Sequence, residues 1–209
     1  MPARKLKVLA FNCTLKSAHG REKSSTDALL KQFLKALEEH GAKGEIVRAV
    51  DHNIKPGVKS DQGDGDDWPA LRKRVLDADI LIIATPIWLG QPSSVAKRVL
   101  ERMDAFLDET DDKGRMPSYG KVACAVIVGN EDGAHHTSAE ICQALFEVGF
   151  TIPPGGATYW VGEAMTGKEY KDLIKTPKAV AEWNPLLASN VAHLARLLKQ
   201  RNYPGSRLT

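Results

Sequence analysis

Hydroxyl side chains gather where a helix is expected to begin. Ser24, Ser25 and Thr26 stand before an apolar pattern of helical spacing, and Thr14 lies upstream in the same polar segment. The free N–H groups and the positive dipole end of a helix start favour an anion. One serine would be enough to cap the helix, so three successive hydroxyls favour a phosphate site. Neither GxGxxG nor GxxxxGK[ST] occurs, which disfavours the usual glycine-rich nucleotide loops.

A second candidate loop follows the strongest apolar run, residues 79–84. The chain continues as Thr-Pro-Ile-Trp-Leu-Gly-Gln-Pro over residues 85–92. Pro86 fixes the backbone, Trp88 offers an aromatic face, and Gly90 permits close approach by a flat ring. Packing of Trp88 in the core or against a subunit is the alternative. The candidate ligand-binding residues here are Pro86, Ile87, Trp88, Leu89 and Gly90.

A third candidate loop, Gly-Asn-Glu-Asp-Gly-Ala-His-His over residues 129–136, follows the apolar run 122–128. Its backbone N–H groups are suited to the polar edge of a flat heterocycle. The adjacent His135 and His136 are candidate metal ligands. However, neighbouring side chains on a helix diverge, and no third ligand is near. We therefore expect no metal, and helix capping or a hydrogen bond at the pocket rim instead. The candidate ligand-binding residues are Asn130, Glu131, Asp132 and Gly133.

Alternating strands and helices must position these loops. The expected strands are 7–11, 45–50, 79–84, 122–128 and 150–153. The expected helices are 24–37, 68–76, a helix with Pro92 in its first turn, 139–148, and a long final helix capped by Asn184 and opened by Pro185. The continuous apolar run 80–83 is typical of a central parallel strand. Ligands of such sheets bind at the carboxyl ends of the strands, so the loops after the first, third and fourth strands should meet.

These residues resemble the NADPH-dependent FMN reductase family, a group of flavodoxin-like proteins that includes flavin-dependent quinone reductases. The resemblance spans about residues 6–155. Its best-matched part is 79–93, which is similar to the family's strand, T-P-x-aromatic run and following helix. Residues 24–26 are similar to its S-x-T, with Cys13 and Thr14 where Gly-Ser usually stands. The resemblance implies a flavodoxin-like α/β three-layer sandwich with a five-stranded parallel sheet.

The resemblance also implies a function. Thr14, Ser24 and Thr26 would hold the phosphate of FMN, and residues 86–90 and 130–133 would surround its ring. NADPH or NADH would reduce the flavin, which passes electrons to flavin, quinone or a similar small acceptor without a catalytic side chain. A flavodoxin-type electron carrier is the alternative, although a pI near 8.7 fits poorly with an acidic docking face. A non-catalytic FMN-binding regulatory module stays open, whereas a hydrolase lacks GxSxG.

Bulk properties set the remaining expectations. The 209 residues carry a net charge of +3 in scattered positions, so neither nucleic acid nor membrane is an expected partner. Three cysteines without CxxC spacing argue against a cluster or disulfide framework. The N-terminus has no apolar signal segment, so we expect a cytoplasmic protein. The resemblance implies a homodimer or a higher homo-oligomer.

Two further expectations concern organisation. Residues 1–155 form the flavodoxin-like FMN-binding domain, and residues 156–209 form a C-terminal extension. The long helix of this extension packs on the same domain or on a partner subunit. The Asp- and Gly-rich stretch 51–67 lacks the spacing of a calcium loop and is expected to be a solvated loop.

Overall fold

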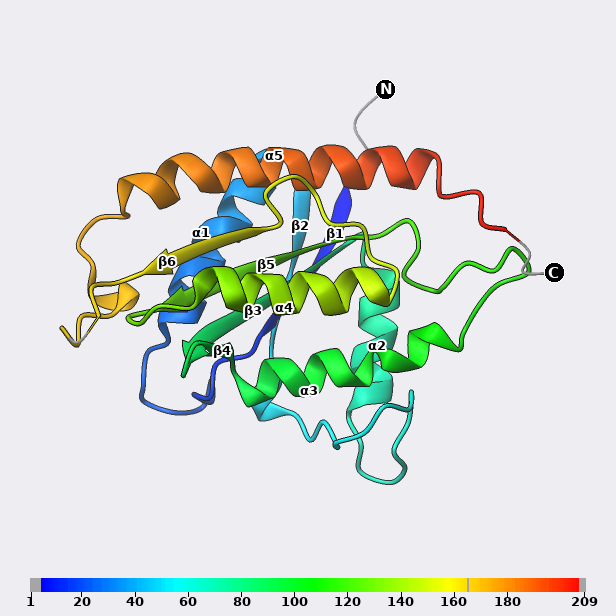
Figure 1. The fold of residues 1–209 in the computed structure, drawn as a ribbon, viewed down its shortest axis with the longest axis horizontal. Helices are drawn as coiled ribbons and strands as arrows, with labels where there is room; N and C mark the ends of the chain where they lie inside the picture. The colour runs from blue at the N-terminus through cyan, green and yellow to red at the C-terminus, as the bar shows by residue number, and fades with distance from the viewer. Residues whose placement is uncertain (1–4, 165, 207–209) are drawn as a thin grey trace.

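A parallel β-sheet lies at the centre of the protein (Figure 1). The computed structural model describes residues 5–164 and 166–206. The parallel strands follow the order β2-β1-β3-β5-β6, and a short β4 pairs antiparallel with the end of β3. Their bounds are β1 Leu6–Asn12, β2 Ala42–Arg48, β3 Ile80–Trp88, β4 Gln91–Pro92, β5 Val122–Gly129 and β6 Ala157–Val161. The predicted flavodoxin-like α/β sandwich is confirmed.

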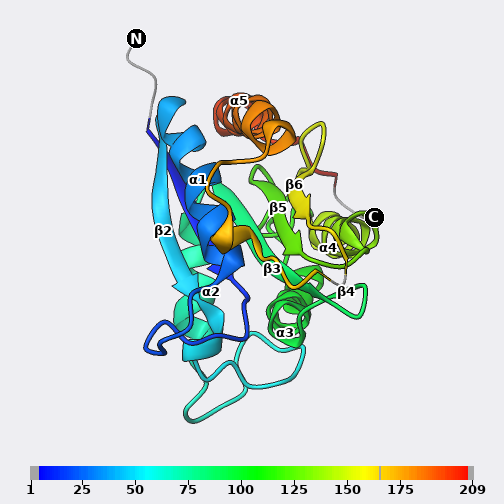
Figure 2. The ribbon, with the colours of Figure 1, turned by 90° about the vertical axis from the view of Figure 1, so that its left-hand side faces the viewer.

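Helices cover both faces of this sheet (Figure 2). One face carries α1 (Ser25–Glu39) and α5 (Lys178–Gln200), which pack against each other. The other face carries α2 (Trp68–Asp77), α3 (Ser94–Arg102) and α4 (Ala134–Glu147). Three short 3-10 turns complete the described elements: η1 Ala49–Asp51, η2 Asp104–Leu107 and η3 Tyr170–Asp172.

The central strand β3 explains why its sequence is continuously apolar. Ile80 and Ile82 pack into the core beneath α1 and α5, while Leu81 and Ile83 pack into the core beneath α2, α3 and α4. All four are fully or almost fully buried. A strand that contacts helices on both faces has no polar side, as predicted.

The segment after β3 differs from the loop that we expected. β3 continues to Trp88, and a two-residue turn at Leu89 and Gly90 leads into β4. Both turn residues have positive φ, 53° and 75°, which suits a tight hairpin. Pro92 pairs with Ile87 in that hairpin, so it is not in the first turn of a helix. We refer to residues 85–92 as the β3 hairpin.

The C-terminal part corrects two predictions. Residues 150–153 contribute a single bridge at Thr151, and the edge strand is β6. A segment that ends in prolines lacks the N–H donors that a longer ladder needs. The long helix α5 begins at Lys178, so Asn184 is not its cap and Pro185 lies inside it. Val180 and Leu187 are both buried in the core, and this burial outweighs the hydrogen bond that Pro185 cannot make.

The stretch 51–67 is not simply solvated. The Asp66 side chain is completely buried and pairs with the equally buried Arg102 at 2.7 Å. The guanidinium of Arg102 also donates to the carbonyl oxygens of Lys55 and Lys59. Sequence patterns do not show which of several aspartates a distant arginine selects, and this pairing is what orders the loop.

Among the residues that the structure describes, no helix combines the length and apolar character needed to cross a bilayer.

Candidate functional site

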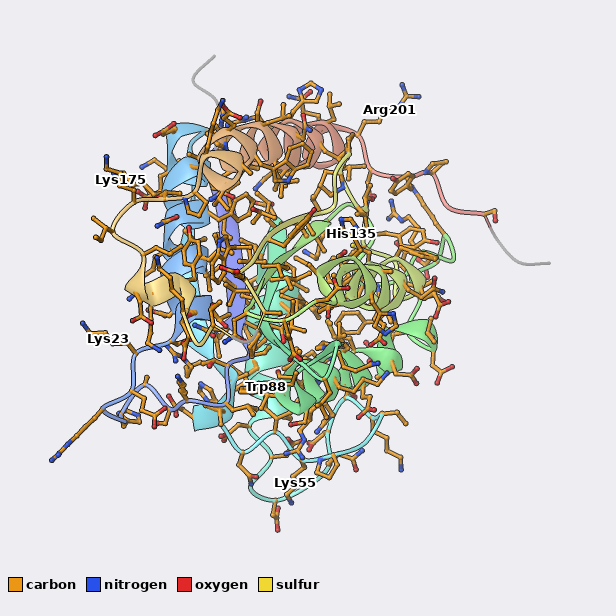
Figure 3. The ribbon with its side chains drawn as sticks, turned by 60° about the vertical axis from the view of Figure 1, so that its left-hand side comes forward. Lys23, Lys55, Trp88, His135, Lys175 and Arg201 are labelled. Carbon is orange, nitrogen blue, oxygen red and sulfur yellow. The ribbon has the colours of Figure 1, made fainter. Side chains whose placement is uncertain are left out.

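A pocket opens at the carboxyl ends of the parallel strands, between the start of α1, the β3 hairpin and the end of β5. Several predicted residues line it: Thr14, Ser24, Ser25, Thr26, Pro86, Ile87, Trp88 and Asn130. Trp88 projects beside the sheet end in Figure 3. The three predicted loops therefore meet at one place, although not every predicted residue reaches the pocket.

The first loop, residues 13–24, is held from below by side chains of β1 and β2. The amide of Asn12 donates to Asp27 Oδ1 at 3.2 Å and accepts from the backbone N–H of Thr14 at 3.2 Å. Arg48 at the end of β2 donates to Asp27 Oδ1 and to the Lys16 carbonyl, each at 2.9 Å. Thr14 is thereby fixed beside the N-terminus of α1.

The hydroxyls at the helix start have separate roles. Ser24 is the N-cap of α1, and its Oγ accepts from the Asp27 N–H at 3.2 Å. Ser25 and Thr26 stand in the first turn, where backbone N–H groups have no partner within the helix. The charged residues of the same loop diverge: Lys16 lines the pocket, whereas the Lys23 side chain points outward (Figure 3).

A buried hydroxyl pair joins the first loop to the β3 hairpin. Ser93 Oγ donates to the Cys13 carbonyl at 2.6 Å and accepts from the Ala96 N–H, which caps α3. Thr85 Oγ1 accepts from the Ser93 N–H at 3.0 Å. The side chain of Cys13 packs into the core, and burial raises the pKa of its thiol. The residue that replaces the usual glycine is thus part of the scaffold.

The third loop mainly braces the β3 hairpin. Glu131 Oε1 accepts from the Leu89 N–H at 3.0 Å. A Cβ added to Gly133, whose φ is +124°, would lie 2.7 Å from the Gly90 Cα, so this close contact requires glycine. Asp132 is exposed and accepts from the adjacent N–H of Gly133. The structure therefore places Leu89, Gly90, Glu131, Asp132 and Gly133 outside the pocket lining, whereas Asn130 belongs to it.

Residues from the C-terminal part complete the pocket and were not among the predicted site residues. Trp160 of β6, Glu169 and Tyr170 lie along one side. The aromatic pair Tyr159 and Trp160 was a visible signal in the sequence, but nothing in it pointed to Glu169. Further lining residues absent from the prediction are Leu15, Lys16, Val128 and Gly129.

The two histidines lie beside the site without forming a ligand cluster. His135 Nε2 is 2.9 Å from the Tyr159 hydroxyl, and His136 pairs with Glu140 at 2.8 Å on the surface of α4. Within residues 5–164 and 166–206, no group of three His, Cys, Asp or Glu side chains could hold a metal ion.

The chemistry of the pocket suits a molecule with an anionic tail and a flat ring. One end presents Thr14, Ser25 and Thr26 with Lys16 beside them, and a carboxylate, that of Glu169, already accepts a hydrogen bond there from Ser25. The other end is aromatic and apolar; it comprises Pro86, Ile87, Trp88, Val128, Trp160 and Tyr170. These donors and surfaces fit the phosphate and the ring of a flavin mononucleotide.

Sequence comparison agrees with this geometry. Residues 6–165 match the NADPH-dependent FMN reductase family, and the chain belongs to that family. FMN-binding flavodoxin-like proteins are therefore the class that this fold and site define.

Particular relatives narrow the comparison. The chain is 34% identical to the 8-demethyl-8-aminoriboflavin-5'-phosphate synthase of Streptomyces davaonensis, over 95% of this chain and 80% of that protein. The crystal structure of RosB with the bound intermediate 8-demethyl-8-formylriboflavin-5'-phosphate superposes with a TM-score of 0.85 at 33% identity, covering 95% of this chain and 82% of that one. A Mycobacterium bovis protein named divalent metal cation transporter MntH is 42% identical over 80% of this chain. The matched part spans only 25% of the length of that protein.

Proposed function

We propose that the pocket binds FMN and that the protein is an NAD(P)H-dependent reductase. NADPH or NADH supplies the electrons, and flavin, quinone or a similar small molecule accepts them. The observation that carries the proposal is that one pocket joins a hydroxyl-rich helix start to an aromatic wall. Family membership supports FMN as the ligand.

Each wall of the pocket has a proposed role. Thr14, Ser24 and Thr26 bind the phosphate together with the free N–H groups of the α1 start. Pro86 and Trp160 contact the ring, and Trp88, which is 51% exposed, shapes the slot that a substrate enters. The bound flavin supplies the hydride and electron chemistry. The protein binds and orients the reactants, and no side chain acts as acid or base.

Absorption spectroscopy tests the proposal first. Purified protein should show a flavin spectrum after incubation with FMN and removal of free ligand. Protein that stays colourless contradicts the proposal. The loaded protein should then oxidise NADPH or NADH when quinone or free flavin is present. Binding without oxidation would favour an electron carrier or a regulatory module.

A second candidate treats riboflavin 5'-phosphate as the molecule that is changed. The 34% identity to a synthase of a modified riboflavin 5'-phosphate supports it, as does the TM-score of 0.85 to RosB. Mass spectrometry of flavin recovered after turnover separates the two candidates. An unchanged mass favours the reductase, and a changed ring mass favours flavin modification.

A homodimer belongs to the same proposal. Trp88 and Leu89 are 51% and 91% exposed at the tip of the β3 hairpin, beside the pocket. Light scattering on the purified protein should give twice the 22.8 kDa chain mass or more. A monomer with full FMN binding would contradict this part only.

A further inference from the structure

The carboxylate of Glu169 lies at the phosphate end of the pocket. Glu169 precedes η3, the short turn after β6, and lines the pocket together with Ser25. Ser25 Oγ donates to Glu169 Oε2 at 3.0 Å, and Lys171 Nζ forms an ion pair with the same oxygen. A hydroxyl of the helix start and a lysine are thus occupied by an internal anion.

The backbone that carries Glu169 is firmly anchored beside α1, where Figure 2 shows the turn. Tyr170 is buried, its hydroxyl donates to Gln32, and its ring lies 5.4 Å from that of Trp160 in an edge contact. The Lys171 N–H donates to Ser25 Oγ at 3.3 Å. The turn is thus held on two sides, and the Glu169 side chain also takes part in a capping box with Asp172 at its start.

The surrounding charges keep this carboxylate ionised. The hydrogen bond from Lys171 lowers the pKa of Glu169 most; burial opposes it, and Ser25 and the positive charge of Lys16 lower it further. The group therefore bears a full negative charge at neutral pH. A phosphate that reached the same donors would meet a like charge at close range.

We propose that the Glu169 carboxylate occupies the position of the ligand's phosphate group and competes with it for the same hydrogen-bond donors and cations. This rests on the proposed FMN site. Binding of FMN displaces the carboxylate from Ser25, and the positive charges of Lys171 and Lys16 then serve the phosphate. Glu169 thereby sets the affinity for the phosphate group and leaves the affinity for the flavin ring unchanged.

The Glu169→Gln variant tests the competition, because glutamine keeps the shape and the hydrogen-bonding oxygen but removes the charge. Glu163→Gln removes the same charge from an exposed position on the same connection. Dissociation constants for FMN and for riboflavin, which lacks the phosphate, are measured by quenching of flavin fluorescence. We expect Glu169→Gln to bind FMN about fivefold to tenfold more tightly, as unit charges a few ångström apart imply.

The affinity of Glu169→Gln for riboflavin should stay within about twofold of wild type, because riboflavin lacks the phosphate that the Glu169 charge repels. The Glu163→Gln control should match wild type for both ligands. An FMN affinity that is unchanged or weaker in Glu169→Gln, or an equal shift for FMN and riboflavin, overturns the inference. If Glu169→Gln binds FMN and wild type does not, the result supports the inference. If neither wild type nor Glu169→Gln binds FMN, the proposed function is overturned as well.

A lysine variant provides the opposite test. Lys171→Met should weaken FMN binding by about tenfold with little change for riboflavin, because it removes the cation that pairs with Glu169 beside the phosphate end of the pocket. Lys168→Met changes an exposed lysine of the same segment and should leave both affinities unchanged. Equal weakening of both ligands by Lys171→Met would mean that the residue only supports the turn, and would overturn its assigned role. Circular dichroism of each variant reports that the fold is intact.

Discussion

The first loop, residues 13–24, and the acidic loop, residues 52–67, both follow the carboxyl ends of neighbouring strands, β1 and β2. Both are rich in polar residues. Their polar groups are used differently. The Asp66 side chain is completely buried and accepts from Arg102 and from the backbone N–H groups of Gln62 and Trp68. Thr14 of the first loop faces a pocket, together with Thr26 at the α1 start.

The difference shows how a binding loop is distinguished from a structural one. A polar group whose hydrogen bonds are met inside the protein stabilises the fold and has little left for a ligand. A polar group that lines a cavity gains its partner when the ligand enters. Substitutions in the acidic loop should therefore change stability, and substitutions at the α1 start should change phosphate affinity.

The largest expected effect is that of Asp66→Asn. It leaves the buried Arg102 guanidinium without its counter-charge, and breaking such a pair costs about 3–5 kcal/mol. Urea denaturation measures the free energy of unfolding, and the ratio of FMN to riboflavin affinity should not change. Asp64→Asn, at an exposed position of the same loop, should be nearly neutral. A small loss in Asp66→Asn would contradict the structural role of the pair.

Acid unfolding sharpens the same contrast. Burial alone would raise the pKa of Asp66, but Arg102 and three backbone N–H groups outweigh it and lower the pKa from 3.8 to about 2. The resulting stabilisation of about 2 kcal/mol is complete above about pH 5 and is lost as the pH falls toward 2. Wild type should lose more stability across this interval than Asp66→Asn. Parallel curves would show that the carboxyl does not contribute.

Ser93→Ala tests whether the first loop depends on the β3 hairpin. It removes the donor to the Cys13 carbonyl and the cap of α3, and the loss should be about 1–3 kcal/mol. Thermal unfolding measures it, with Ser94→Ala as the exposed neighbour for control. If the two variants unfold alike, the buried pair does not hold the loops together.

Thr26→Val tests the phosphate end with an isosteric side chain. The lost hydrogen bond to a charged group should raise the dissociation constant of FMN about tenfold and leave that of riboflavin unchanged. Thr110→Val, at an exposed position away from the pocket, is the control. An equal loss of riboflavin affinity in Thr26→Val would mean that the hydroxyl acts on ring binding or on the fold, and not on the phosphate.

The smallest effect should come from Glu131. Glu131→Ala removes the acceptor of the Leu89 N–H, and Glu131→Gln keeps it. We expect Glu131→Ala to weaken FMN and riboflavin equally, by about threefold, because it loosens the hairpin rather than a ligand contact. Isothermal titration with both flavins measures this. A loss in Glu131→Gln as large as in Glu131→Ala would mean that the charge matters, and not the brace.

Sequence pattern was sufficient for the layers of the fold and for the meeting of three loops. The run Ile80–Ile83 is apolar on both sides because the strand contacts helices on both faces, and such a signal is local. The hydroxyls at the start of α1 and the Pro-x-Trp of β3 are also local signals, and both line the pocket. The start of α5 was missed because burial of Val180 overrides the boundary that Pro185 indicates.

The sequence by itself determined which residues could meet a phosphate and a ring. Their side-chain chemistry and their position directly after a strand are both visible in a short stretch of sequence. Tertiary structure alone decided how they are used. Contacts between segments far apart in the chain make Glu131 a brace for Leu89, make Asp66 the partner of Arg102, and bring Glu169 to Ser25. Such pairings depend on where the chain returns in space, which no local pattern contains.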